Sequence, residues 1–484
     1  MSGVETDYLV IGAGAIGMAF VDSLLDHGPA DTRITIIDRH PKPGGHWNTS
    51  YPFVTLHQPS VTYGLSQLPL NDGVIDQAGP NAGFGELASG AQVQAYYDHA
   101  MRHKFVPSGR VHYLPMTDYE GGADGVHRIR TILSGDVREI GARKLVDGRK
   151  FAAQVPTITK RKWQADGVLV MTPGELGTLA SSGMAVPGHF VIMGGGKTAC
   201  DVGVWLLQMG VSARQISWVR PRDTWFFNRA SIQTGADHLA QAIDFPRSQM
   251  RAAAAAASGA EIFHMMEADG HMLRIDRDSE PTKFHFPTIS QAEVDLLATI
   301  EDVIRIGRVT SVIPGTLTGL DGTASVPEDS LYIDCTATAA PRSVTEPIWQ
   351  GEDTIVPQLM QVPLVSLSAA AAGFIEGLFE TDSEKNALGA PGRITDTVEH
   401  FPEALLINAT NRMLWNGSTT VTGWLSDNRL DPGARMVKAL ASATPEMQAA
   451  AKSIRSATVA AVPNLQKLVL AEQARDKALE QVES

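Results

Sequence analysis

The chain has few cysteines and no long apolar run. Only two cysteines, Cys200 and Cys335, occur among its 484 residues, and they lie far apart in the sequence. This scarcity excludes the CxxC pair of a disulfide reductase and is typical of a reducing cytoplasm. No apolar run reaches the roughly 18 residues of a membrane helix, and the acidic N-terminus has no signal-peptide pattern. We therefore expect a cytoplasmic protein with no membrane partner.

Metal-ligand spacing and excess positive charge are also missing. Neither HExxH nor a paired Cys/His spacing occurs, so we do not expect His264, His271 and His285 to bind a metal. The formal net charge is −13, which disfavours a nucleic-acid partner because phosphate binding needs clustered lysine and arginine. A composition of 43% hydrophobic and 19% charged residues indicates an ordinary globular protein, and the length favours roughly three domains.

Residues 7–47 contain a dinucleotide-binding pattern. An apolar run at 8–11 leads directly into the turn GAGAIG, and residues 18–25 then predict a helix. A second apolar run, 34–37, ends on Asp38. This order of strand, glycine turn, helix, strand and acid is the context in which a GxGxxG motif binds a dinucleotide. The residues expected to contact it are Gly12, Gly14, Ala15, Ile16, Gly17 and Asp38.

Each part of this motif has a physical task. Gly12 permits the tight turn, Gly14 allows backbone to approach a pyrophosphate, and Gly17 allows helix and strand to pack closely. Asp38 lies 21 residues after Gly17, close to the roughly 20 expected for a carboxylate that binds ribose hydroxyls.

A second pattern of the same kind begins at residue 190. The apolar run 190–193 precedes the turn GGGKTA, and the next strand, 215–219, ends on Arg220-Pro221-Arg222 where an acid would favour NADH. Arginine accommodates a 2′-phosphate, so this site is expected to prefer NADPH; two surface arginines without that role are the alternative. The residues expected to bind this cofactor are Gly194, Gly196, Lys197, Thr198, Arg220 and Arg222.

The segment GGHWNTSYPFVTLHQPSVTY, residues 44–63, resembles the region after the first Rossmann unit of class B flavoprotein monooxygenases, the flavin-containing and Baeyer–Villiger monooxygenases. The resemblance implies that the first dinucleotide is FAD. It places His57 and Gln58 beside the flavin as candidate catalytic residues; loop polar groups satisfied by backbone are the alternative. Further FAD contacts implied by the resemblance are Arg39, Gly45, His46, Trp47, Met116, Thr336 and Ala337.

The expected fold is α/β, with two Rossmann-type domains, the second inserted in the first, and a mainly helical C-terminal extension. The expected units are an FAD-binding part (1–150), an NADPH-binding domain with a helical insertion (151–330), a return strand to the FAD domain (331–345) and a helical cap (346–484). The cap either closes a substrate pocket over the flavin or completes the fold. Its last helix is a surface helix or a contact in a homodimer.

The resemblance implies an NADPH-dependent FAD monooxygenase that uses O2 to oxygenate a small molecule at nitrogen, sulfur or a ketone carbon through a peroxyflavin. One departure concerns the motif FxGxxxHxxx(Y/W) that such enzymes carry between the two units. The corresponding stretch, 163–176, has no histidine. Two alternatives therefore stay open: an NADPH-dependent flavin oxidoreductase without oxygen insertion, and a cofactor-bound protein without turnover. The sequence does not specify the substrate.

Overall fold

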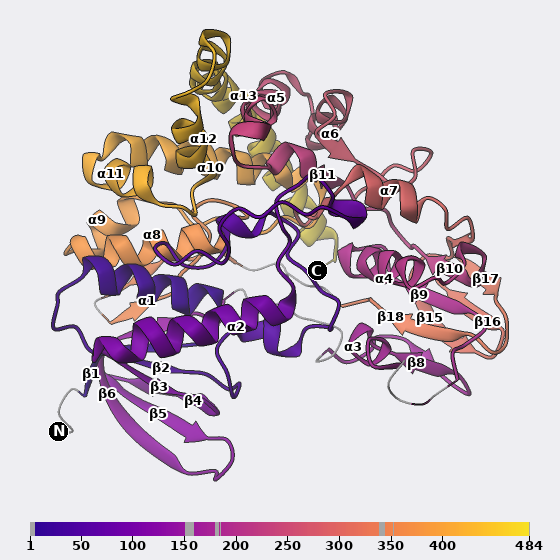
Figure 1. Cartoon of the computed structure of the whole chain (residues 1–484), viewed down its shortest axis with the longest axis horizontal. Coiled ribbons are helices and arrows are strands. Elements are labelled where there is room, and N and C mark those ends of the chain that lie inside the picture. Colours follow the sequence, from indigo (N-terminus) through magenta and orange to yellow (C-terminus); the bar gives the residue numbers. More distant parts are fainter. Residues whose placement is uncertain are drawn as a thin grey trace.

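The structure, a computed structural model, describes residues 5–150, 159–179, 183, 185–337, 344–351 and 353–483. It contains two parallel sheets that stand apart, with a layer of helices spanning both (Figure 1). Within the part of the chain so described, no helix is long and apolar enough to cross a bilayer.

The first sheet is built around β1 (Thr6–Ile11), which lies parallel between β2 (Ile34–Ile37) and β6 (Val137–Asp147). Its path continues through β3 (Val111–Leu114) on one side. The turn after β1 leads into α1 (Ala15–His27). Further elements of this part are α2 (Gly90–Ala100) and the strands β4 (Thr117–Ala123) and β5 (Val126–Thr131). Strand β4 pairs antiparallel with β5, and β5 pairs antiparallel with β6.

The second sheet has the order β14-β10-β9-β18-β8. All its strands fall between β6 and the strands that rejoin the first sheet, so the predicted insertion of one Rossmann unit in the other is confirmed. Its strands are β8 (Leu169–Met171), β9 (Phe190–Met193), β10 (Ile216–Val219), β14 (Val303–Ile304) and β18 (Leu331–Asp334). Its helices are α3 (Pro173–Leu176), α4 (Lys197–Gln208) and α7 (Gln291–Leu297), and a small sheet beside it contains β7 (Gln164–Ala165), β15 (Val309–Ile313), β16 (Thr316–Gly319) and β17 (Gly322–Ser325).

The structure corrects the expected return strand at residues 331–345. β18 pairs with β9 and β8 inside the second sheet, and the chain rejoins the first sheet later, where β20 (Thr354–Ile355) pairs with β6 and β19 (Trp349–Gln350) pairs with β20. A short apolar run such as LYID fits the centre of either parallel sheet, and its composition does not specify its neighbours. Residues 338–340 of that prediction lie outside the described residues.

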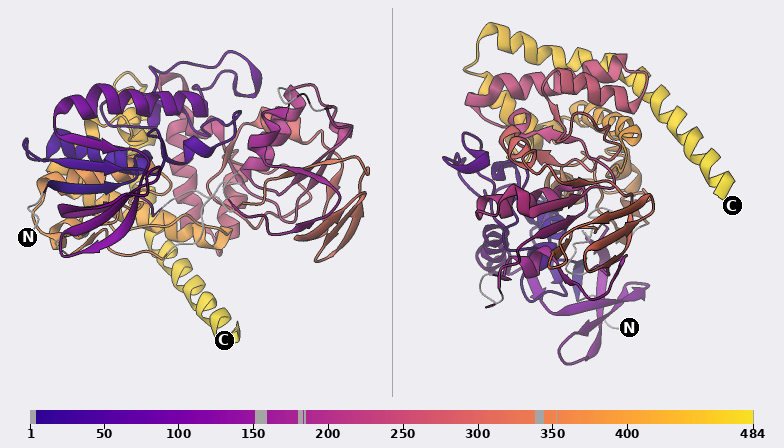
Figure 2. Two further views of the ribbon diagram at one scale, coloured as in Figure 1. Left: turned by 90° about the horizontal axis from the view of Figure 1, so that it is seen from below. Right: turned by 90° about the vertical axis from the view of Figure 1, so that its right-hand side faces the viewer.

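The helical layer combines the insertion with the C-terminal extension. Helices α5 (Leu239–Ala255) and α6 (Gly259–Ala268) come from the insertion, beside the small strands β11 (Phe226–Asn228), β12 (Met272–Leu273) and β13 (Thr288–Ile289). The extension supplies α8 (Val365–Leu378), α9 (Asp382–Ala387), α10 (Phe401–Gly417), α11 (Thr419–Asp427), α12 (Pro432–Leu440) and α13 (Pro445–Glu483). Helix α13 runs beside α5, and its C-terminal end projects from the body of the molecule (Figure 2).

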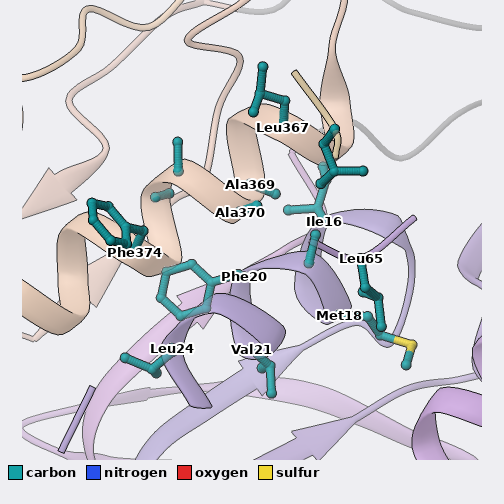
Figure 3. Packing of buried hydrophobic residues seen from close by; sticks show 14 of the residues in the cluster. Ile16, Met18, Phe20, Val21, Leu24, Leu65, Leu367, Ala369, Ala370 and Phe374 are labelled. Atoms are coloured by element: carbon teal, nitrogen blue, oxygen red, sulfur yellow. The ribbon is translucent and has the colours of Figure 1, made fainter. Parts of the chain in front are cut away.

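Helix α8 packs directly on α1 and so connects the extension to the first sheet. Phe20 of α1 faces Ala369, Ala370 and Phe374 of α8 (Figure 3). The approach is close enough that a Cβ atom added at Gly373 would lie 2.1 Å from the backbone oxygen of Phe20. Small residues at this crossing let the two helices meet backbone to backbone.

Replacing Gly373 with alanine tests this contact. Alanine favours a helix by about 1 kcal/mol over glycine, but here its methyl group meets backbone, so we expect a net loss of about 1–3 kcal/mol in the free energy of unfolding. Gly423 in α11 is the control, because a Cβ atom there meets nothing within 4 Å. Denaturant unfolding should show Gly423→Ala unchanged or stabilised; equal effects of the two changes would contradict the close approach.

Candidate active site

A cavity of about 2170 Å³ begins at the first glycine turn and extends into the helical layer. Most of the residues predicted for the first cofactor line it: Gly12, Gly14, Ala15, Ile16, Asp38, Arg39, Gly45, His46, Trp47, His57 and Gln58. Thr198, near the start of α4 in the second Rossmann unit, lines the same cavity. The second unit therefore reaches this cavity at the start of α4, whereas Gly194, Gly196 and Lys197 are not among its lining residues.

The first turn has the geometry that its glycines predict. Gly12 has a φ of +99°, in the left-handed region that favours glycine. A Cβ atom at Gly17 would lie 1.9 Å from the oxygen of Gly12, so Gly17 allows α1 to pack against the turn. A Cβ atom at Gly14 would lie 3.3 Å from Cα of Gly45, which brings the segment after β2 against the turn. The start of α1 is left facing the cavity.

Asp38 both shapes the turn and faces the cavity. Its Oδ2 accepts a 2.6 Å hydrogen bond from the backbone N–H of Ala13, and its Oδ1 accepts one of 2.7 Å from His40. Burial raises the pKa of this carboxyl, while the two backbone donors act in the opposite direction. Each carboxylate oxygen has a further lone pair, so the group can also accept a ribose hydroxyl.

Three residues predicted for FAD lie elsewhere or are already occupied. Met116 follows β3 with a φ of +52°; its N–H donates to His40 and its carbonyl accepts one hydrogen bond from Ile132, and it is not among the residues that line the cavity. Thr336 follows β18, and its N–H donates to Asp334. Because β18 belongs to the second sheet, Thr336 and Ala337 lie at the second glycine turn, where Cys335 is close to Gly194.

The second turn again uses a glycine in the left-handed region, since Gly194 has a φ of +124°. Gly196 precedes α4, and a Cβ atom there would meet nothing within 4 Å. Lys197 is the first residue of α4, but its Nζ is paired with Asp201 one turn along the helix and lies 3.7 Å from Glu293. Its charge is thus directed into the protein.

The two arginines after β10 differ in their exposure and in their partners. Arg220 is buried, and its guanidinium lies 3.4 Å from carboxylates of both Asp223 and Asp276. Arg222 is exposed, and its backbone oxygen lies beside Gly195 of the second turn. Arg220 is therefore already neutralised within the protein, whereas the side chain of Arg222 is exposed beside the second turn.

A buried charged network joins the two Rossmann units. Asp201, besides pairing with Lys197, accepts a 2.6 Å hydrogen bond from the Tyr51 hydroxyl. Glu293 receives Arg229 at 2.6 Å, and Lys197 and Arg229 outweigh the effect of burial and lower the pKa of Glu293 to about 2. Arg229 also donates to the carbonyl of His57 at 3.1 Å. The network fixes the loop that carries His57 and Gln58 relative to the second unit.

Comparison with known proteins agrees with this architecture. Residues 10–73 match the NAD(P)-binding Rossmann-like domain. The chain is 36% identical over 429 residues to the uncharacterized protein Rv2000 of Mycobacterium tuberculosis strain H37Rv, covering 88% of this chain and 78% of that protein. The uncharacterized protein Mb2023 of Mycobacterium bovis matches to the same extent. The chain belongs to the family of these mycobacterial proteins.

The fold of this chain is similar to that of a solved monooxygenase. The polycyclic ketone monooxygenase from the thermophilic fungus Thermothelomyces thermophila superposes with a TM-score of 0.50 at 13% identity, covering 97% of this chain and 88% of that one. A fold hosts many activities, so the chemistry of this family member has to be argued from its own site.

Several features of the site have little or no signal in the sequence. The pairing of Lys197 with Asp201 follows from their spacing of four on a helix, but Glu293 and Arg229 are brought in by the tertiary fold. The segment DTWFFNR, residues 223–229, contributes to both core and cavity, because Trp225 is fully buried whereas Phe227 lines the cavity. The extension likewise helps to enclose the cavity, with α10, α12 and α13 among its walls.

Burial of His57 gives a testable pH dependence. Burial, followed by the charge of Lys197, lowers the pKa of His57 to about 4 from 6.5, so this imidazole is neutral at pH 7. Between pH 6.5 and 4 the unfolded chain binds a proton here that the folded protein does not, so stability falls as the pH decreases.

We expect His57→Gln to reduce this loss by up to about 1.4 kcal/mol per pH unit. Unfolding in guanidinium at several pH values measures how the free energy of unfolding of the wild type and the variant depends on pH. Wild-type and variant curves with the same slope would contradict the assignment.

Proposed function

We propose that this family member is an FAD- and NADPH-dependent monooxygenase. The observation that carries the proposal is the shared cavity: the first glycine turn, the loop with His57 and Gln58, and Thr198 of the second unit all line it. The overall reaction would convert NADPH, H⁺, O2 and a substrate into NADP⁺, water and the oxygenated substrate. Bound FAD would supply the redox chemistry, accepting a hydride and passing the electrons to O2.

The residues at the first turn fit FAD. The N–H groups at the start of α1 are available for a pyrophosphate, and Gly14 and Gly45 leave the backbone bare where such a group would lie. Asp38 has free lone pairs for a ribose, and the cavity exceeds the roughly 300–1,000 Å³ of a single small-molecule site. The space beyond the dinucleotide is then available for isoalloxazine and substrate.

The chain's own contribution to the reaction is positioning and solvent exclusion. Arg229 holds the His57 carbonyl, and Tyr51 holds Asp201, so the flavin-side loop and α4 keep a fixed separation. His57 is neutral, and it can donate one hydrogen bond without bringing a charge to the cavity. Helices α10 and α13 enclose the space from the other side, which keeps reduced cofactor from bulk water.

Reoxidation of the flavin distinguishes the proposal from its alternatives. The purified protein, reduced anaerobically with dithionite, is mixed with O2 in a stopped-flow spectrometer. A monooxygenase should return to the oxidised spectrum in two phases, the second accelerated by a substrate. A single phase that no candidate substrate alters would indicate an oxidoreductase without oxygen insertion. Protein that does not retain FAD would contradict the assignment of the first turn.

The exposed arginine at the second turn gives a prediction about cofactor preference. Arg222→Ala should raise the KM for NADPH roughly fivefold, because an exposed charge-assisted bond to a 2′-phosphate contributes about 1 kcal/mol, and should leave the KM for NADH unchanged. Arg214→Ala is the matched control, since Arg214 is exposed at the opposite end of β10. Equal changes for NADPH and NADH would exclude Arg222 from phosphate recognition.

A further inference from the structure

The part of the cavity farthest from the glycine turn is walled by one face of each of three helices. In every case the lining residues recur at spacings of three and four, which places them on a single helical face. They are Ala242, Phe245, Pro246 and Gln249 of α5; Leu405, Asn408, Ala409, Arg412, Met413 and Asn416 of α10; and Ala451, Ile454, Arg455, Thr458 and Val459 of α13. This space is called the helical chamber below.

The helical chamber is predominantly apolar. Phe227, Phe286 and Phe401 form its aromatic side, with ring centroids 5.8 Å apart for Phe286 and Phe401. Arg412 lines it, but both of its terminal nitrogens bind Asp431, at 2.9 and 2.8 Å, so this charge is neutralised. Arg455 of α13 also lines the chamber, but it is an exposed residue whose guanidinium lies toward solvent while its stem covers apolar surface. The buried lining is therefore suited to hydrocarbon.

Three exposed apolar residues also line the cavity. Met413, Val437 and Val459 line the cavity and are 44%, 64% and 57% exposed. They come from α10, α12 and α13, so the apolar lining continues from the interior to the surface. Single exposed apolar residues are common on proteins, but three that border one cavity mark an entrance for an apolar ligand.

The helical chamber is long and held in place. The lining face of α10 runs from Phe401 to Asn416, about 22 Å at the 1.5 Å rise per residue of a helix. Helix α13 is fixed to α5 by Asn464, which donates hydrogen bonds to the carbonyls of Ala253 at 2.9 Å and Ala256 at 2.8 Å. A fixed wall of this length provides a preformed site for an extended molecule.

We propose that the helical chamber binds a substrate with a long aliphatic chain, whose oxidisable group lies toward the flavin side near His57 and Gln58. This inference rests on the proposed monooxygenase function and adds the substrate class to it. The chain would be held by burial of apolar surface, and the polar groups of the cavity would act only at the reacting end.

Binding of straight-chain methyl ketones of increasing length, from butanone upward, tests the proposal. Isothermal titration calorimetry of the holoenzyme gives Kd for each. We expect Kd to fall roughly fourfold for each added methylene, the equivalent of about 0.8 kcal/mol, with a heat-capacity change that becomes more negative. Affinity that does not depend on chain length would overturn the proposal.

Two variants of α13 locate the binding site. Ala451 lines the helical chamber and is half-buried, whereas Ala449 is exposed on the same helix. Ala451→Trp should weaken binding of the long ketones at least tenfold and leave butanone unaffected, and Ala449→Trp should change neither. Equal behaviour of the two variants would place the chain elsewhere.

Calorimetry does not depend on flavin turnover, so the two proposals can fail separately. Chain-length-dependent binding without two-phase reoxidation would retain the aliphatic site and overturn the monooxygenase. Two-phase reoxidation without chain-length-dependent binding would retain the monooxygenase and overturn the aliphatic substrate.

Discussion

The buried network of Tyr51, Asp201, Lys197, Glu293 and Arg229 is the interaction on which the functional geometry depends. It joins the flavin-side loop to the second Rossmann unit through charges that are all paired. Removing one partner of such a network leaves an uncompensated buried charge and costs about 3–5 kcal/mol. This penalty opposes separation of the two units and keeps the start of α4 beside the cavity that begins at the first glycine turn.

Much of the local structure could be predicted from sequence, because the glycine turns, the apolar strands and the acid after β2 are local signals. Gly12 and Gly17 have the tasks that the motif assigns them. The neighbours of a strand are not specified locally: β18 pairs within the second sheet although the short run LYID fits either one. The sequence indicated that Arg220 could contact a 2′-phosphate. In the fold it pairs with Asp276, which lies 56 residues away in the sequence and could not be identified as its partner from local spacing.

The packing of the C-terminal extension could not be predicted from the sequence either. Its helices could be predicted from composition, but whether they cover the cavity depends on which face each one turns inward. The small residues of α8, above all Gly373, let it pack on α1 and anchor the extension to the first sheet. Helices α10 and α13 line the cavity, so the extension forms part of its wall.

Anaerobic mixing of the FAD-loaded protein with NADPH tests the central claim, that both cofactors meet in one cavity, most directly. The account predicts stoichiometric loss of the oxidised flavin absorbance, slowed when the transferred hydrogen of NADPH is replaced by deuterium, because hydride passes directly between the cofactors. Protein that binds both cofactors but shows no reduction of the flavin would contradict it.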